Sequence, residues 1–533
     1  MLLALVVWIS VRGGRPKRAL GRLVERKLGG YRHEVEPGDP ALPRNVCAGA
    51  PSVAVLGAGL AGIGAASTLA ERGIGVTLFE RNAYLGGKIG AWKVPVGDGV
   101  QTVEHGFHAF FRQYYNLNEF LDRLGVRKDF RAIEDYVILH SDLQPQSYGE
   151  VDTAPALNIV DLGRRGFYRW RDVMRTRTRE RLDSFVRFDM KRTYEAFDAI
   201  PFGLYCEEAD LPPELRLSFR TFARAFFSDE ADLSTADVLR AFHFYYLSHD
   251  HGLLYDYPAG DYETTLLAPI RAHLEAHGVE LRMGSPVSSI ERGETKRFRI
   301  GSDEYDWVVL AADIPGMKSI VEGSAWLHEA DPNFVRNMRA LRTSHGYAVW
   351  RIWVDRDVRP GLPTFINVER KRVLDSVTLY HRVTDEASAW VEVNGGAVLE
   401  LHSYALPREL DGDAEIRQVF LDELHHYFPE LEGLTISDEV LQVRHDFPAF
   451  APGQHALRPA AEVSVQGLLM AGDWVRLPYP MTHMEAAFVS GLLCANVIFR
   501  ELGIREETVF TVAPRGLLAP KRVSAAQPAL ETP

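Results

Sequence analysis

Four short apolar runs, rich in valine and leucine, stand out along the chain. They cover Val53–Leu56, Val76–Phe79, Asp306–Ala312 and Leu468–Asp473. Runs of this length, bounded by turn residues, are typical of strands that are buried in a parallel sheet. We therefore predict four buried strands from segments that are far apart in the sequence.

Helical and strand patterns alternate between these runs. One helix is predicted to end over Phe120–Gly125. Further helices are predicted to cover most of Val151–Tyr205, Leu211–Asp250, Leu266–Ala276 and Met484–Glu501. Two further strands are predicted within Val279–Ile290, where a turn at Gly284 precedes the second strand, which starts at Val287. Two more are predicted over Phe365–Val373 and Ala397–Ser403. From Ala513 onward the chain is rich in proline and alanine, and we expect it to be loosely ordered.

The first apolar run leads into a glycine-rich turn and then into a helical segment. The six residues of the turn are Gly57, Ala58, Gly59, Leu60, Ala61 and Gly62. Gly57 permits the tight turn, Gly59 lets a pyrophosphate approach the backbone, and Gly62 allows close helix packing. Glu80 ends the next strand, where a carboxylate can meet an adenosine ribose. The pattern predicts a dinucleotide site, and the alternative is a glycine-rich helix start without a ligand.

A second glycine pair follows soon after the acidic residue. The chain continues from Glu80 into Arg81 and then into Gly86, Gly87 and Lys88. A nicotinamide-binding fold does not need this pair. It resembles the flavin amine oxidase and carotenoid desaturase superfamily, in which a Gly-Gly-Arg/Lys loop runs along the pyrophosphate and flavin. The resemblance implies FAD as the cofactor, and a plain surface turn is the alternative.

The last apolar run ends in Gly472 and Asp473, and a small-residue helix carrying Met484 follows. This resembles the C-terminal flavin motif of the superfamily, where the aspartate meets the ribityl or pyrophosphate region and the next helix points at the isoalloxazine. The resemblance also implies that the segment around Val287 touches the adenine side. An ordinary buried strand followed by a capping aspartate is the alternative.

The resemblance implies the fold class and the domain order. We expect an α/β fold (α+β overall), in which a Rossmann-like FAD-binding domain of the flavin amine oxidase/desaturase type is interrupted by a substrate domain of mixed sheet and helices. The expected parts are an N-terminal segment 1–50, the FAD-binding domain 51–110, 265–318 and 440–503, the substrate domain 111–264 and 319–439, and a tail 504–533.

The stretch from Glu104 to Leu117 indicates the branch of the superfamily. Its sequence, EHGFHAFFRQYYNL, resembles a Gly-x-His-x-Phe-Phe segment of plant and cyanobacterial type carotenoid desaturases. The Arg-Gln-Tyr-Tyr-Asn-Leu part is most similar to the carotenoid φ-ring and χ-ring synthases, which aromatise β-ionone rings such as those of β-carotene. The stretch GDWVRLPYP from Gly472 also resembles that subgroup, whereas MTHME, at Met481–Glu485, departs from its pattern.

The implied chemistry needs an oxidant, a base and a dry tunnel. Flavin accepts a hydride from a carbon beside a π system; the ring cation then undergoes a 1,2-methyl shift, and proton losses complete an aromatic ring. Carboxylates or imidazoles must take the protons, and water must be excluded. The candidate catalytic residues are Glu104, His105, His108 and Glu485. The candidate tunnel-lining residues are Phe107, Phe110, Phe111 and Tyr114, although aromatic clusters more often form core.

Composition and charge exclude several classes of protein. The chain has 533 residues, a net charge of -12 and three cysteines. The acidic balance argues against a nucleic-acid partner. The cysteines, Cys47, Cys206 and Cys494, are too scattered for a zinc site or a disulfide framework, so we predict no metal site and a reducing, cytoplasmic compartment.

The N-terminus suggests contact with a membrane. Met1–Ile9 is apolar but much shorter than the ~20 residues of a spanning helix. A basic tract up to Arg32 follows, in which Leu20, Leu23, Val24 and Leu28 share one helical face. Such a helix can lie on an anionic lipid surface. We therefore predict a peripheral protein on the inner face of the cell membrane, with a lipophilic carotenoid substrate and a quinone as electron acceptor; a solvated tail is the alternative.

Other functions remain open at this point. A desaturase or an isomerase acting on the linear polyene would share the motifs, and so would a flavin amine oxidase with a cationic substrate. A prenyl-cargo escort protein keeps the fold without using flavin, but its glycine motif is usually degraded, whereas both motifs are intact here.

Overall fold

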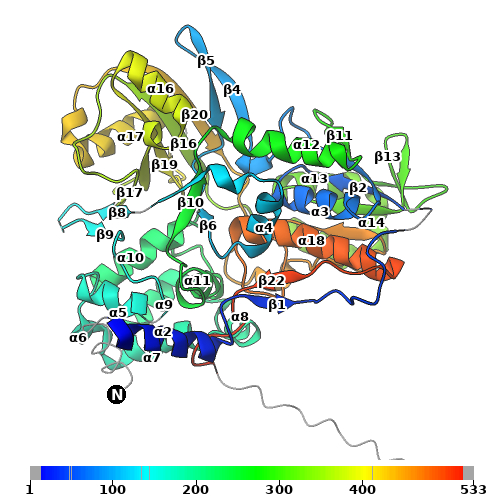
Figure 1. Ribbon diagram of the computed structural model, residues 1–533, viewed down its shortest axis with the longest axis horizontal. Helices are drawn as coiled ribbons and strands as arrows, with labels where there is room; N and C mark the ends of the chain where they lie inside the picture. The colour runs from blue at the N-terminus through cyan, green and yellow to red at the C-terminus, as the bar shows by residue number, and fades with distance from the viewer. Residues whose placement is uncertain are drawn as a thin grey trace, which may run out of the picture.

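The computed structural model describes residues 14–519, except residues 47, 48, 50, 134, 143, 156 and 411. The apolar segment Met1–Ile9 therefore lies outside the described residues. Figure 1 shows three parts: a five-stranded sheet with its helices on the right, a seven-stranded sheet at the upper left, and a layer of helices at the lower left.

The five-stranded sheet joins strands from distant parts of the chain. Its order is β11-β3-β2-β15-β21 and every neighbouring pair is parallel. In that order the strands are Glu280–Arg282, Gly75–Phe79, Ser52–Leu56, Trp307–Leu310 and Leu468–Met470. All four apolar runs predicted to be buried strands are confirmed. Because the strands are parallel, the turns that follow them all leave the sheet at one edge.

Helices α3 (Leu60–Ala70) and α18 (His483–Leu502) pack against each other beside this sheet. The helices can approach closely because each carries a glycine at the crossing. A Cβ atom added at Gly491 would lie 2.1 Å from the carbonyl oxygen of Ala61, and one at Gly64 would lie 2.5 Å from that of Phe488. This contact fixes the start of α18, more than 400 residues further along the chain, beside the start of α3.

The seven-stranded sheet has the order β20-β16-β19-β18-β17-β8-β9. In that order its strands are Ile436–Arg444, Tyr347–Val354, Ala397–Ser403, Ser376–Leu379, Phe365–Val368, Tyr136–Leu139 and Gln146–Ser147. Only the β17–β8 pair is parallel. The central strands β16 and β19 are buried along their whole length, with α17 (Asp413–Tyr427) packed on one face.

The helical layer lies where the sequence predicts helices between Val151 and Asp250. Its main members are α5 (Leu157–Arg164), α7 (Thr176–Val186), α8 (Met190–Phe197), α9 (Phe202–Glu208), α10 (Pro213–Arg224) and α11 (Thr235–Phe242). The amphipathic helix α2 (Gly14–Leu28) lies along this layer (Figure 1). Its residues Leu20, Val24 and Leu28 are buried against Leu157 and Val160. The prediction that this apolar face meets a membrane is therefore wrong for Leu20, Val24 and Leu28, which the protein itself covers, whereas Leu23, the fourth residue of that face, is exposed.

Two other predictions about local structure are also wrong. No strand begins at Val287, because residues 284 and 285 are tied to the turn after β3: Gly284 N donates to Asn82 O at 2.8 Å and Ser285 N to Glu80 O at 2.8 Å. The segment predicted to be loose from Ala513 onward is ordered over residues 513–519, since Ala513 is buried and its carbonyl accepts a hydrogen bond from His243 Nε2 at 2.6 Å; from residue 520 it lies outside the described residues.

Candidate functional site

A cavity of about 710 Å³ begins at the carboxyl edge of the five-stranded sheet and continues between the seven-stranded sheet and the helical layer. Of the residues predicted to contact a cofactor, Gly62 alone does not line it. The others line it: Gly57, Gly59, Leu60, Ala61, Glu80, Arg81, Gly86, Gly87, Lys88, Val287, Gly472, Asp473 and Met484. Segments that are remote in sequence therefore share one cavity wall.

The glycine turn after β2 is shaped by close backbone contacts. Gly57 has a positive φ of 113°, which glycine adopts without strain. A Cβ atom at Gly62 would lie 1.8 Å from the Gly57 carbonyl oxygen, so Gly62 is a packing residue. At Gly59, in contrast, an added Cβ would have no neighbour nearer than 4.0 Å. Gly59 thus leaves open space at the cavity wall where its backbone can meet a ligand.

The second glycine pair lies directly beside this turn. Gly86 N donates to Ala58 O at 2.9 Å, and Gly59 and Gly86 form a parallel bridge. Helix α3 begins after Gly59 without a side-chain cap, so its first N–H groups are available to a ligand at its positive end. The two glycine loops and the helix start form a cradle suited to a pyrophosphate.

Glu80 holds the neighbouring loop ends together. It is buried, and its Oε2 accepts a hydrogen bond from Ala58 N and its Oε1 one from Asn82 N, both at 2.9 Å. Each carboxylate oxygen keeps a further lone pair. Glu80 can therefore accept a hydrogen bond from a sugar hydroxyl in the cavity while it keeps both backbone partners.

One ion pair connects the two glycine motifs, and a second ties the first motif to the segment that follows β15. Lys88 Nζ lies 3.3 Å from Asp473 Oδ2, and Arg81 Nη2 lies 2.9 Å from Asp313 Oδ2. Gly472 N donates to Ser490 Oγ at 2.8 Å, which fixes the turn against α18. The N-terminal and C-terminal motifs therefore face the same space, as an extended dinucleotide requires.

Residues 60–499 match the family described as flavin containing amine oxidoreductase. The chain belongs to this family. It is a flavin-dependent oxidoreductase, and the cradle, the uncapped helix start and Glu80 fit that cofactor.

Relatives and solved structures add to this family assignment. The chain is similar to the carotenoid phi-ring synthase of Streptomyces griseus, with 33% identity over 90% of this chain and 93% of that protein. It is also similar to the carotenoid phi-ring synthase of Chlorobaculum tepidum, with 26% identity over 87% and 91%. The structure resembles that of a putrescine oxidase variant, with a TM-score of 0.60, 16% identity and coverage of 85% and 99%; this likeness concerns the fold.

Aromatic rings line the part of the flavoprotein cavity beyond the glycine motifs. Phe107, Phe111 and Tyr114 lie along it as predicted, whereas Phe110 is buried away from it. The Phe111 ring lies 4.6 Å from Tyr245 and 5.3 Å from Tyr255, centroid to centroid. This part of the cavity is an aromatic tunnel.

The two predicted histidines both line the cavity. His105 Nε2 lies 2.5 Å from the hydroxyl of Tyr347, which also donates to Asp446 Oδ1 at 3.2 Å. His108 Nδ1 lies 2.7 Å from Gly106 O. Burial lowers the pKa of His105 and lowers that of His108 to about 4. Both imidazoles are therefore neutral at neutral pH.

The two predicted carboxylates do not line the cavity. Glu104 lies behind its wall, where Oε2 accepts from Arg351 Nη2 at 2.7 Å and from the Tyr380 hydroxyl at 2.6 Å. Glu485 accepts from Asn116 N at 2.9 Å and Leu117 N at 3.1 Å at the start of α4 (Tyr115–Arg123). Neither carboxylate lies in the cavity itself, and both hold wall segments in place.

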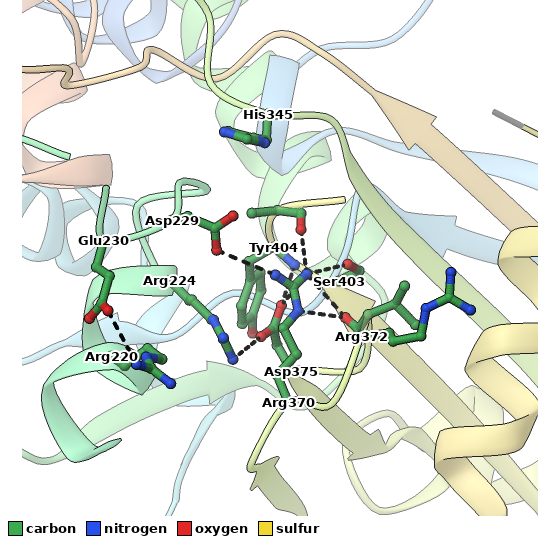
Figure 2. A network of polar contacts seen from close by, with 12 residues as sticks. Arg220, Arg224, Asp229, Glu230, His345, Arg370, Arg372, Asp375, Ser403 and Tyr404 are labelled. Atoms are coloured by element: carbon green, nitrogen blue, oxygen red, sulfur yellow. Dashed lines mark hydrogen bonds and ion pairs between the residues drawn. The ribbon is translucent and has the colours of Figure 1, made fainter. Parts of the chain in front are cut away.

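Further polar contacts support this wall. Glu400 Oε1 accepts from Phe107 N at 2.8 Å, and its Oε2 accepts from Arg351 Nε at 2.9 Å. Figure 2 shows Asp375 between Arg224 and Arg370, which lie 3.3 Å and 3.2 Å from it. Arg224 ends α10, so the pair joins the helical wall of the cavity to the seven-stranded sheet.

Sequence inspection did not identify several residues of the site. Tyr347, Asp446, His402, Tyr245 and His483 all line the cavity. Asp446 follows β20 in a segment expected to return to the cofactor, which was an available signal. His483 lies in the MTHME segment, whose departure from the subgroup pattern was also an available signal, whereas the others lie in strands or helices whose sequences resemble ordinary core.

We predict that Gly59→Val abolishes flavin retention. Gly59 has a φ of -75°, which valine tolerates, and the added atoms would enter the cavity rather than the packed core. The visible absorbance of purified protein near ~450 nm, as expected of an oxidised flavin, should disappear while the unfolding temperature stays near that of the flavin-free wild type. Gly75→Val, at the exposed start of β3, is the matched control and should remain yellow. Wild-type flavin content in Gly59→Val would contradict the cradle.

Glu485 should make stability depend on pH. Burial raises its pKa to about 7, although three donated hydrogen bonds favour the carboxylate. Because the folded state holds this proton more tightly than the unfolded state, the folded protein is stabilised below pH 7 relative to Glu485→Gln. As the pH is lowered from 7 to 5, the unfolding free energy of wild type should rise relative to that of Glu485→Gln by up to about 1.4 kcal/mol per pH unit. Denaturant titrations give this difference, and a constant value would show an unshifted pKa.

Proposed function

We propose that this protein is an FAD-dependent carotenoid ring-aromatising enzyme. It desaturates a β-ionone ring of β-carotene and moves one methyl group to the neighbouring carbon, giving a φ-type aromatic ring as in isorenieratene. The observation that carries the proposal is one continuous cavity, which begins at a dinucleotide cradle and ends in an aromatic tunnel. The 33% identity to a carotenoid phi-ring synthase supports this substrate.

The cradle residues would bind the FAD. The N–H groups at the start of α3, with Gly59 and Gly86, would hold the pyrophosphate, and Glu80 the adenosine ribose. Asp473, paired to Lys88, would meet the ribityl chain. When bound, FAD accepts the hydrides that the ring loses. Each ring gives up two hydrides and two protons, and a quinone-class acceptor takes the electrons afterwards.

The tunnel provides what a ring cation needs. Aromatic faces such as those of Phe111 and Tyr255 stabilise positive charge. Glu104 and Glu485 are kept behind the wall by their own partners, so neither can add to the cation. His105 and His108 remain candidate proton acceptors, since both line the cavity as neutral imidazoles.

The pigment product tests the proposal directly. Expression of the gene in cells that make β-carotene should yield carotenoids with one or two aromatic rings, detected by chromatography and mass spectrometry. The Gly59→Val variant is the control and should leave β-carotene unchanged. Unchanged β-carotene with the wild-type gene, together with conversion of a linear carotene or oxidation of an amine, would reject ring aromatisation.

We also propose that the protein works at the surface of an anionic membrane, where its substrate resides. No helix in the described part of the chain is long and apolar enough to span a bilayer. Because the apolar face of α2 is buried, the contact must use its outer side. Arg22, Leu23, Arg26 and Lys27 are exposed there, a combination suited to anionic headgroups.

Vesicle binding tests the membrane contact. Replacing Arg22, Arg26 and Lys27 together by glutamine should weaken binding to vesicles that contain phosphatidylglycerol by roughly a hundredfold, because each basic residue near the surface contributes about 1 kcal/mol. Co-sedimentation measures the change, and Arg408→Gln, at an exposed site far from α2 in the sequence, should bind as wild type does. Equal binding by the triple variant would exclude this surface.

A further inference from the structure

His483 occupies an unusual position at the start of α18. It lies in the MTHME segment that departs from the φ-ring and χ-ring synthase pattern, and it lines the cavity. Its φ is 51°, a left-handed conformation that costs a non-glycine residue energy. Phe450 shares this conformation, and the ring of Phe226 lies 5.7 Å from Phe450 and 4.9 Å from His483. His483 therefore combines a strained backbone with a place in the cavity wall.

Hydrogen bonding fixes the tautomer of His483. Its Nε2 lies 3.2 Å from the carbonyl oxygen of Ala225. A carbonyl can only accept, so Nε2 carries the hydrogen. Nδ1, 3.0 Å from the hydroxyl of Tyr245, must therefore accept the hydrogen bond. The ring presents a basic nitrogen toward Tyr245.

A chain of hydroxyls ends at this nitrogen. Tyr245 uses its own hydrogen for His483, so it accepts from its other neighbours. Thr482 Oγ1 donates to it at 2.9 Å, and the Tyr114 hydroxyl lies 2.8 Å away and must also donate. Tyr114 and Tyr245 line the cavity. All these hydrogen bonds point in one direction, toward His483.

The charges around the ring keep it neutral and ready to accept a proton. Burial lowers the pKa of His483 to about 4; Asp473 opposes this shift, whereas Arg240 and Lys88 add to it. The remaining groups packed against the ring are uncharged: the Tyr245 hydroxyl, the Ala225 carbonyl and the Phe226 ring. A ring carbocation is a far stronger acid than an imidazolium, so a base of this strength suffices.

We infer that Tyr245 and His483 together accept one of the two protons that each substrate ring loses during aromatisation, an inference that rests on the proposed function. After a hydride has left to the flavin, a ring C–H bond breaks and its electron pair enters the ring. Because the Tyr245 oxygen already accepts two hydrogen bonds, the substrate proton passes to the oxygen of Tyr114, the Tyr114 proton moves to Tyr245, and the Tyr245 proton moves to His483 Nδ1. The new imidazolium is compensated by the carboxylate of Asp473, whose charge favours it.

Single-turnover experiments with FAD-loaded protein and β-carotene test this role. His483→Asn keeps an acceptor for the Tyr245 hydroxyl but cannot take the proton, and Tyr245→Phe interrupts the transfer. Both variants should retain FAD, and substrate should bleach the flavin absorbance at a rate close to that of wild type. The aromatic product should form about 100-fold more slowly than in wild type. The double variant should be no slower than either single one, because the residues act as a unit. His345→Asn, outside the cavity and paired with Asp232, should behave as wild type.

A second measurement does not depend on turnover. Nitrogen-15 NMR of histidine-labelled, flavin-free protein should show His483 as the neutral tautomer with hydrogen on Nε2 near pH 7, a signal that His483→Asn removes. In the NMR experiment, the other tautomer or a protonated ring would overturn the inference. In the single-turnover experiment, equal slowing of bleaching and product formation, or no slowing of either, would overturn it. If wild type fails to aromatise β-carotene, the proposed function falls, and this inference with it.

Discussion

The site depends on the position of β15 between two strands from opposite ends of the chain. Leu310 of β15 is in register with Leu56 of β2 on one side and with Met470 of β21 on the other. Both glycine turns must therefore leave the sheet at the same edge, one strand apart. The Lys88–Asp473 pair and the contact between α3 and α18 follow from this arrangement. Without the pairing of β15 with β21, the turn at Gly472 and Asp473 would not lie beside the N-terminal glycine turn.

Several buried charges of this protein lie behind the cavity wall. Arg351 is bonded to both Glu104 and Glu400, and Asp375 lies between two arginines (Figure 2). Charges buried in this way cost desolvation energy and are tolerated when fully paired. They hold backbone groups such as Phe107 N in place, so an apolar tunnel can be rigid. For chemistry through a carbocation, this separation keeps Glu104 and Glu400 from reacting with the intermediate.

Different parts of the wall serve different needs of the proposed reaction. The glycine cradle supplies backbone N–H groups, the tunnel supplies aromatic faces, and the α18 start supplies the hydroxyl chain to His483. These parts meet because α18 begins close to α3 and to the Asp473 turn. The same helix also carries Glu485, which caps α4. A single helix start therefore joins cofactor, substrate wall and a neighbouring helix.

The sequence alone determined what depends on near neighbours: the strand over Val53–Leu56, the glycine turn after it, the helix that follows, and the family. Tertiary structure decided what depends on distant partners. Glu485 finds its donors 369 residues away at Asn116, and α2 hides Leu20, Val24 and Leu28 beneath α5. A local pattern encodes conformation and polarity but not which surface covers it. Whether a buried carboxylate serves chemistry or architecture is therefore set by contacts that no short motif contains.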